Sequence, residues 1–131
     1  MHIGWKLRQL ARWHSERVAI IDEVGSWTHR TFHSRINRFG NAMAGIGLDR
    51  GDRIALIVPD LREYLEADYG TMSAGFVRVP IDPRLTRAET VAMLRHADVR
   101  ALVTHSSFAE KVDRLAADVE SLAHVVSIGG P

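Results

Sequence analysis

The polar residues best placed to do chemistry follow the short apolar runs that we expect to form strands. Asp60, Asp82, Arg84 and His105 each lie within a few residues of the end of such a run. In an open parallel sheet, ligands bind beyond the carboxyl ends of the strands. Two acids, an arginine and a histidine at one edge are therefore positional candidates for a ligand site.

Most of these candidates also have a simpler structural interpretation. Asp60 can cap a helix, with Glu63 three residues later in capping-box spacing. Asp82 lies between the turn residues Pro80 and Pro83. Structural roles are thus the favoured interpretation of the set.

His29 and His33 lie four residues apart on one predicted helix face, a spacing that could hold a metal ion. A zincin motif would need a glutamate between them and a third ligand, and Arg30 stands beside His29 instead. We therefore expect exposed histidines at a helix start, and we assign no catalytic, cofactor-binding or metal-ligating residue to the chain.

Other catalytic motifs are missing from the sequence. It contains no G-x-S-x-G elbow, no Walker A loop and no G-x-G-x-x-G turn. A phosphoacceptor site would want clustered acids and a lysine, and the two lysines, Lys6 and Lys111, are not placed for it. Residue chemistry alone thus indicates an α/β domain without a visible active site.

Residues 51–86 predict the unit that would position these side chains. Residues 54–58 form an unbroken apolar run, typical of a strand covered on both faces, and Pro59 ends it. A helix follows and stops near Gly75, and a second strand covers residues 77–81. The stripe of this helix consists of Leu61, Leu65, Tyr69 and Met72.

The other segments extend this pattern on both sides. Residues 3–14 predict an amphipathic helix whose tryptophans, Trp5 and Trp13, pack on the domain or on a partner surface. Residues 18–21 and 26–28 predict a hairpin. Thr28 caps a long helix, in which Gly40 suggests a close helix crossing. Its core stripe consists of Phe32, Ile36, Phe39, Met43 and Ile46.

The second half of the chain predicts two more helices and two more strands. A capping box at residues 86–89 begins a helix that ends near residue 97, and another at residues 107–110 begins a helix with apolar positions up to residue 122. Strands are expected at residues 101–103 and 125–128. The fold class is therefore α/β: a mainly parallel sheet of about four strands with helices on its faces, plus an N-terminal helix and a β-hairpin.

Composition narrows the classes of partner. The chain has 131 residues, 46% hydrophobic and 25% charged, with a net charge of +1. Such a balance gives no overall field toward nucleic acid or anionic lipid. There is no cysteine and no apolar run of the roughly 20 residues that a membrane span needs, so we expect a cytoplasmic protein without disulfides.

Four segments in order resemble the N-terminal part of the adenylate-forming (AMP-binding) enzymes, which include acyl-CoA synthetases, peptide-synthetase adenylation domains and luciferases. Residues 18–22 with 27–32 resemble the family's opening Ala-Ile…Thr-Tyr-x-Glu-Leu motif, and residues 37–38 with 42–47 resemble the helix after it. Residues 51–55 are similar to Gly-Asp-x-Val-Ala. Residues 72–82 are similar to Lys-Ala-Gly…Val-Pro. His29 and Thr31 depart from the family's tyrosine and glutamate, at positions that look structural.

The resemblance implies the N-terminal segment of a larger enzyme, spanning residues 1–131. Residues 83–86 followed by Glu89 look like acyl-CoA synthetases, and the second aromatic-proline pair typical of peptide synthetases is missing. The parent enzyme would use ATP, Mg²⁺ and CoA to adenylate a carboxylic acid, expected to be a fatty acid, and to transfer the acyl group to CoA. The family's phosphate loop and catalytic lysine match nothing here, so we expect a structural segment, inactive alone and binding no cofactor.

Two alternatives remain open at this point. The chain could be a self-standing interaction module of the same ancestry, or part of a peptide-synthetase adenylation domain. A phosphate loop encoded beyond Pro131 would favour the enzyme, and a stop codon the module. Because a segment of this kind would expose apolar surface, we expect its partners to be the rest of the enzyme and further copies of itself.

Overall fold

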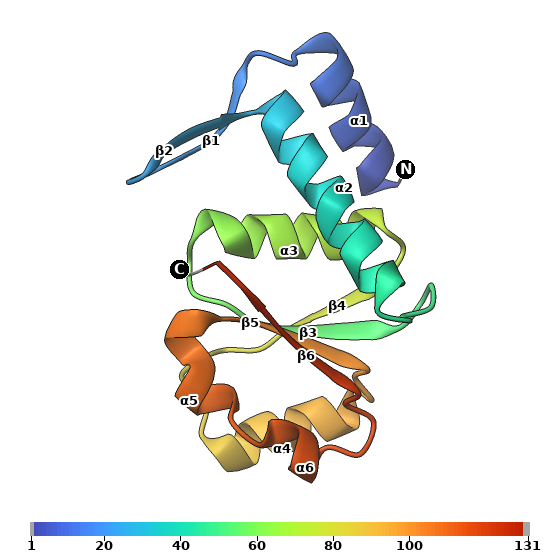
Figure 1. The fold of residues 1–131 in the computed structure, drawn as a ribbon, viewed down its shortest axis with the longest axis vertical. Coiled ribbons are helices and arrows are strands. Elements are labelled where there is room, and N and C mark those ends of the chain that lie inside the picture. Colours follow the sequence, from blue (N-terminus) through green and yellow to red (C-terminus); the bar gives the residue numbers. More distant parts are fainter. Residues whose placement is uncertain (1, 130–131) are drawn as a thin grey trace.

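A four-stranded parallel sheet lies at the centre of the computed structural model, which describes residues 2–129 (Figure 1). The strand order is β4-β3-β5-β6, and a separate antiparallel hairpin pairs β1 with β2. The predicted fold class is confirmed. The strands are β1 (Val18–Asp22), β2 (Gly25–Thr28), β3 (Arg53–Ile57), β4 (Val77–Pro80), β5 (Ala101–His105) and β6 (His124–Ile128).

Helices cover both faces of this sheet (Figure 1). One side carries α3 and the C-terminal half of α2, with α1 outside them; the other side carries the helices from the second half of the chain. The helices are α1 (Ile3–Trp13), α2 (His29–Gly45), α3 (Arg62–Ser73), α4 (Arg87–His96), α5 (Ala109–Val112) and α6 (Leu115–Asp118), with a 3₁₀ turn, η1 (Ser106–Phe108), before α5.

The central strand β3 is buried on both faces, as its unbroken apolar run predicted. Ile54 and Leu56 face the cluster under α2 and α3, whereas Ala55 and Ile57 face the cluster under α4, α5 and α6. All four side chains are at most 1% exposed. Alternation along the strand therefore places two cores on opposite sides of one sheet.

Helix α3 is covered on both sides, because α1 and α2 pack over it. Leu65 and Tyr69 face a third cluster formed by Leu7 of α1 with Phe32 and Ile36 of α2. Glycine allows the helices to approach closely: a Cβ on Gly40 would lie 2.8 Å from the Cβ of Ala74. The close crossing suggested by Gly40 is confirmed.

The caps predicted for α2 and α4 are confirmed. The Thr28 hydroxyl accepts a hydrogen bond from the Thr31 backbone N–H. Thr86 and Glu89 form a reciprocal capping box, in which Glu89 accepts from the Thr86 N–H and Thr86 accepts from the Glu89 N–H. Local sequence signals therefore set the start of both helices.

Gly75 ends α3 in the left-handed region, with φ of +88°. A Cβ there would lie 3.0 Å from Cγ of Arg50, and the backbone angle itself disfavours any side chain.

We expect Gly75→Val to lower the free energy of unfolding by more than about 1 kcal/mol, measured by urea denaturation. Gly75→Asn should lose less, because asparagine tolerates this conformation; equal losses would show that the backbone angle is not the cause.

The structure corrects two predicted helix starts. Helix α3 begins at Arg62 after Leu61, which makes no side-chain cap, and Asp60 stands outside the helix as an exposed residue. The predicted capping box at residues 107–110 is also wrong. The His105 side chain accepts from the Ser107 backbone N–H instead and begins the 3₁₀ turn η1.

The single helix expected after residue 107 is wrong as well. It breaks at Asp113 and Arg114, where Arg114 has φ of +58°. One arginine of α4 binds the backbone at the break, and a second binds the backbone at the end of α6. Arg87 donates to the Asp113 carbonyl oxygen at 2.7 Å, and Arg95 donates to the Asp118 carbonyl oxygen at 2.7 Å. The expected core positions Val112, Leu115, Val119 and Leu122 are nevertheless buried.

Three residues expected to pack through apolar faces are exposed. Leu61, the first position of the predicted α3 stripe, precedes the helix and is 43% exposed. Ile46, the last position of the predicted α2 stripe, follows the helix end and is 38% exposed. Trp13, which the sequence predicted to pack on the domain or on a partner surface, is 67% exposed, whereas Leu7 of the same helix is buried. The core face of α1 is therefore narrower than the sequence suggested.

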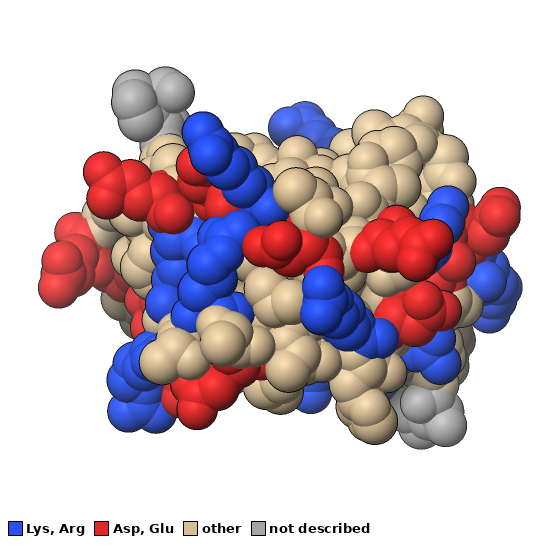
Figure 2. Space-filling model, turned by 90° about the horizontal axis from the view of Figure 1, so that it is seen from below, with Lys and Arg blue, Asp and Glu red and all other residues tan. Residues whose placement is uncertain are grey.

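Charged residues of both signs share the surface formed by the second half of the chain. Figure 2 shows acidic and basic side chains interleaved on the face seen from below, where α4 and α6 lie. Among the described residues, none of the helices combines the length and apolar character needed to cross a bilayer.

Candidate functional site

The carboxyl ends of β3 and β4 border a hollow of about 550 Å³. It contains three of the four residues predicted at this edge, namely Asp60, Asp82 and Arg84, and it brings them together with Tyr64 of α3. Three prolines line it: Pro80 at the end of β4, and Pro59 and Pro83 in the loops after β3 and β4. The parallel-sheet rule thus located a real concavity.

Asp82 and Arg84 bind each other across this rim. Arg84 donates from Nε and Nη2 to the carboxylate, with Nη2 to Oδ2 at 2.8 Å, and its backbone N–H donates to Oδ1 at 2.9 Å. These hydrogen bonds from Arg84 lower the pKa of Asp82 to about 2. Asp82 is therefore a bound carboxylate at neutral pH and a poor proton carrier.

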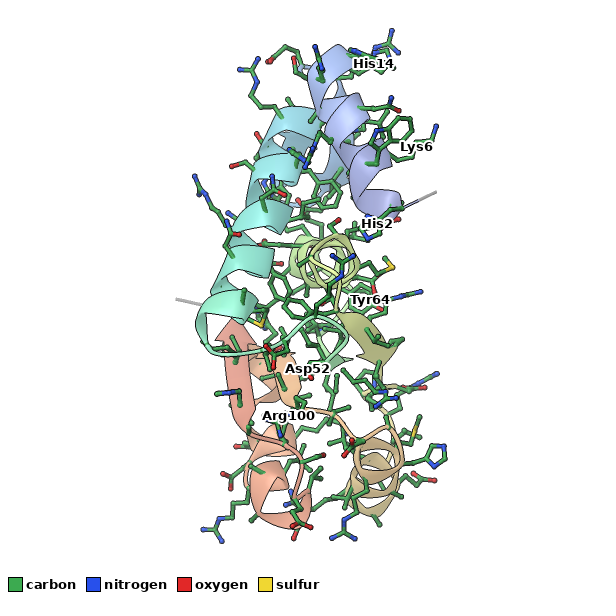
Figure 3. The ribbon with its side chains drawn as sticks, turned by 90° about the vertical axis from the view of Figure 1, so that its right-hand side faces the viewer. His2, Lys6, His14, Asp52, Tyr64 and Arg100 are labelled. Atoms are coloured by element: carbon green, nitrogen blue, oxygen red, sulfur yellow. The ribbon has the colours of Figure 1, made fainter. Side chains whose placement is uncertain are left out.

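Tyr64 reaches the same hollow from α3. Figure 3 labels it below α1. Burial raises the pKa of its phenol, and the nearby Asp68 carboxylate acts in the same direction. Asp68 in turn accepts from Arg78 Nη1 at 2.7 Å. The phenol is thus a neutral hydrogen-bonding group at pH 7, which sequence reasoning did not single out.

His105 lies at the end of β5, outside the hollow between β3 and β4. Its Nδ1 lies 2.8 Å from the Ser107 hydroxyl, in addition to accepting from the Ser107 N–H. A Cβ on Gly129 would lie 2.6 Å from Cδ2 of His105. The ring therefore has a capping role under the end of β6, and the structure does not join it to Asp82 and Arg84.

His29 and His33 do not form a metal site with a third ligand within residues 2–129, where no group of three or more potential ligands occurs. His33 instead lies 3.4 Å from the Asn37 side-chain nitrogen. Burial lowers the pKa of His33, and the positive charge of Arg8 adds to this effect. The positive charge of Arg8 beside the His33 ring disfavours a bound metal ion there, and Arg30 follows His29 directly in the sequence.

The edge hollow can hold a small polar ligand, but its side chains form no catalytic set. The described lining contains no serine, cysteine or lysine nucleophile, and its only arginine is occupied by Asp82. The polar side chains of the hollow mainly stabilise the loops that follow β3 and β4. A structural role for these residues stays a prediction, and for Asp60 it is not the predicted helix cap.

A second polar cluster joins the hairpin to α2 and α3, and sequence reasoning missed it. Arg62 makes a two-pronged ion pair with Asp22, and its guanidinium carbon lies 4.7 Å from the centre of the Trp27 ring. Arg35 covers the same ring at 4.6 Å and binds Glu66 at 2.8 Å. Because Asp22 and Arg62 are 40 positions apart, no local motif announces the pair.

Asp22 gives this cluster a defined acid sensitivity. The hydrogen bonds from Arg62 lower the pKa of Asp22 from 3.8 to about 2, against the opposing effect of burial, and the Gly25 and Val24 N–H groups help. A lowered folded-state pKa stabilises the fold above about pH 4, and that contribution is lost as the pH falls toward 2.

Urea midpoints of wild type and Asp22→Asn should therefore differ at neutral pH and converge at about pH 2. A constant difference across this range would contradict the assignment.

The sequence model of the family described as AMP-binding enzyme matches residues 7–130. Among curated proteins, the chain is 29% identical over 122 residues to a 3-hydroxybenzoate–CoA/4-hydroxybenzoate–CoA ligase of Thauera aromatica, covering 93% of this chain and 23% of that protein. The chain spans about a quarter of the length of the curated relatives that it matches.

Solved structures show the same arrangement of elements. The anthranilate CoA ligase AuaEII, crystallised with anthranoyl-AMP, superposes with a TM-score of 0.91 at 25% identity, over 99% of this chain and 25% of that one. A Mycobacterium tuberculosis fatty acyl CoA synthetase superposes with a TM-score of 0.90 at 26% identity, over 97% and 26%.

Proposed function

The chain belongs to the AMP-binding enzyme family, and on that premise we propose that it forms the N-terminal part of an ATP-dependent carboxylic acid–CoA ligase. The similar proteins described above are acyl- and aryl-CoA ligases. The parent enzyme would adenylate a carboxylate with ATP, releasing pyrophosphate, and the thiol of CoA would then displace AMP from the acyl carbon. A cytoplasmic location stays a prediction.

One observation carries this proposal: the family match is continuous from residue 7 to residue 130, yet it covers about a quarter of each relative. The region therefore corresponds to one portion of a larger catalytic unit. The departures at His29 and Thr31 do not disturb that portion, because α2 still begins with the Thr28 cap.

We propose that the nucleotide and the metal ion of the parent enzyme bind outside this segment. The acids at the sheet edge are bound, as Asp82 is by Arg84, or exposed, as Asp60 is. No group of three potential metal ligands occurs within residues 2–129. We therefore assign no step of the reaction to this segment and propose that it positions, as a folded support, the parts that carry the chemistry.

For the substrate we propose a fatty acid, in line with the likeness to a fatty acyl CoA synthetase. Because the chain is also similar to hydroxybenzoate and anthranilate ligases, the alternative substrate is an aromatic acid. The test is AMP release by the ligase that contains this segment, with ATP, CoA and either decanoate or benzoate. Faster turnover with decanoate supports the fatty-acid assignment, whereas a preference for benzoate would replace it with an aromatic one.

Apolar side chains exposed on the segment are expected to be covered by the rest of the enzyme or by a second copy. Ile21 and Val24 at the hairpin are 78% and 86% exposed, and Val125 lies on β6, which pairs only with β5 among the described strands. We expect the isolated chain to form dimers or larger species in light scattering, and Ile21→Ser/Val24→Ser to reduce them. A monomer at high concentration would contradict this expectation.

A further inference from the structure

Every exposed residue of α1 is either a tryptophan or a cation. Trp5 and Trp13 are 48% and 67% exposed, and the other exposed positions of this helix are Lys6, Arg8 and Arg12. The helix contains no aspartate or glutamate. We call these five residues the α1 face. The three positive charges of this face are largely balanced by acids elsewhere in the chain, so the net charge of the whole chain is only +1.

The hollow beside α1 adds no negative charge to this face. A hollow of about 220 Å³ lies between α1, α2 and the end of α3, and the described residues lining it include Arg8, His2 and His33 but no carboxylate. The nearest acid along the chain, Glu16, pairs with Arg30 of α2. Figure 3 shows His2, Lys6 and His14 along α1, with Arg100 toward the opposite end of the molecule.

The interleaving of indoles and cations favours one kind of partner. Indole rings partition to the boundary between water and lipid, because they combine an apolar ring with an N–H donor. Lysine and arginine bind the negative surface of an anionic leaflet. A purely apolar groove would have to desolvate the three cations, and an acidic protein would leave the two indoles without a matching surface.

We propose that the α1 face binds the surface of an anionic lipid bilayer, with both indoles at the level of the headgroups and the three cations against lipid phosphates. The helix lies on the bilayer without crossing it, because its apolar side, with Leu7 buried, is already packed on the domain. This inference rests on α1 and does not depend on the proposed ligase function.

Vesicle sedimentation tests the proposal directly. The chain is mixed with phosphatidylcholine vesicles that either lack or contain phosphatidylglycerol. We expect binding to the anionic vesicles, weakening with added salt, and little binding to the neutral ones. Lys6→Glu/Arg12→Glu should reduce the association constant at least about tenfold. The matched control, Arg38→Glu/Arg100→Glu, makes the same change of charge at exposed positions outside the α1 face and should bind like wild type.

Tryptophan quenching provides an independent readout. Brominated phosphatidylcholine in the anionic vesicles should quench wild-type fluorescence, but not that of Trp5→Phe/Trp13→Phe. The remaining Trp27 lies in β2, half-buried, with the guanidinium groups of Arg35 and Arg62 over its ring. Three results would overturn the proposal: no binding to anionic vesicles at low salt, equal weakening by the control variant, or quenching that persists when only Trp27 remains. Protection of Trp5 and Trp13 in a vesicle-free dimer would assign the face to self-association instead.

Discussion

Gly70→Val is expected to lower the free energy of unfolding by about 3 kcal/mol, because it inserts a branched side chain at the closest approach of α2 and α3. A Cβ on Gly70 would lie 2.6 Å from Cδ1 and 3.1 Å from Cβ of Phe39. Phe39 cannot retreat easily, since it is 5% exposed and belongs to the core cluster above the sheet. The helices would have to separate, which would loosen the packing of α2 over α3.

Urea denaturation followed by circular dichroism measures this loss. Gly45→Val is the matched control, because a Cβ on Gly45 meets no atom within 4 Å. It should change the stability by less than about 0.5 kcal/mol. Equal losses in the two variants would mean that valine acts through general helix propensity and not through the crossing.

Arg78→Met is expected to lower the free energy of unfolding by about 2 kcal/mol, because it leaves the Asp68 carboxylate buried without its cation. Asp68 is 7% exposed, and Arg78 Nη1 donates to it at 2.7 Å. The loss falls below the roughly 3–5 kcal/mol typical of fully buried pairs, since the Arg78 side chain is 41% exposed and water can partly replace it.

A double variant isolates the cause of this loss. Asp68→Asn/Arg78→Met removes the unpaired charge and should recover part of the stability lost in Arg78→Met. Arg84→Met, which breaks the exposed pair with Asp82, should leave the melting temperature nearly unchanged. A double variant no more stable than Arg78→Met would show that Arg78 acts through packing of its stem.

Sequence patterns predicted the fold where the signal was local. The unbroken run in β3, the caps at Thr28 and Thr86 and the glycine end of α3 each depend on residues within one turn of each other. At the break in the helix after α4, Arg87 binds the Asp113 carbonyl oxygen from 26 residues away. Such contacts override local helix propensity, and no pattern within the segment announces them.

In the candidate site, too, the sequence predicted the features set by strand direction but not those set by packing between distant segments. The rule for parallel sheets placed Asp60, Asp82 and Arg84 at one edge correctly, because it follows from strand direction alone. It could not indicate that His105 would cap a neighbouring turn, nor that Tyr64 would enter the hollow from α3. The ion pair of Asp22 with Arg62 is set by the packing of the hairpin on α3, which the sequence does not specify locally.

The most direct test of the proposed supporting role compares pyrophosphate release by two proteins. One is the isolated 131-residue chain, and the other is the ligase that contains it, each with ATP, Mg²⁺, a fatty acid and CoA. We predict acid-dependent release by the ligase and none above the blank by the isolated chain, which should be folded as judged by circular dichroism. Release that depends on the isolated chain would contradict this account, because it would place catalytic groups within residues 1–131.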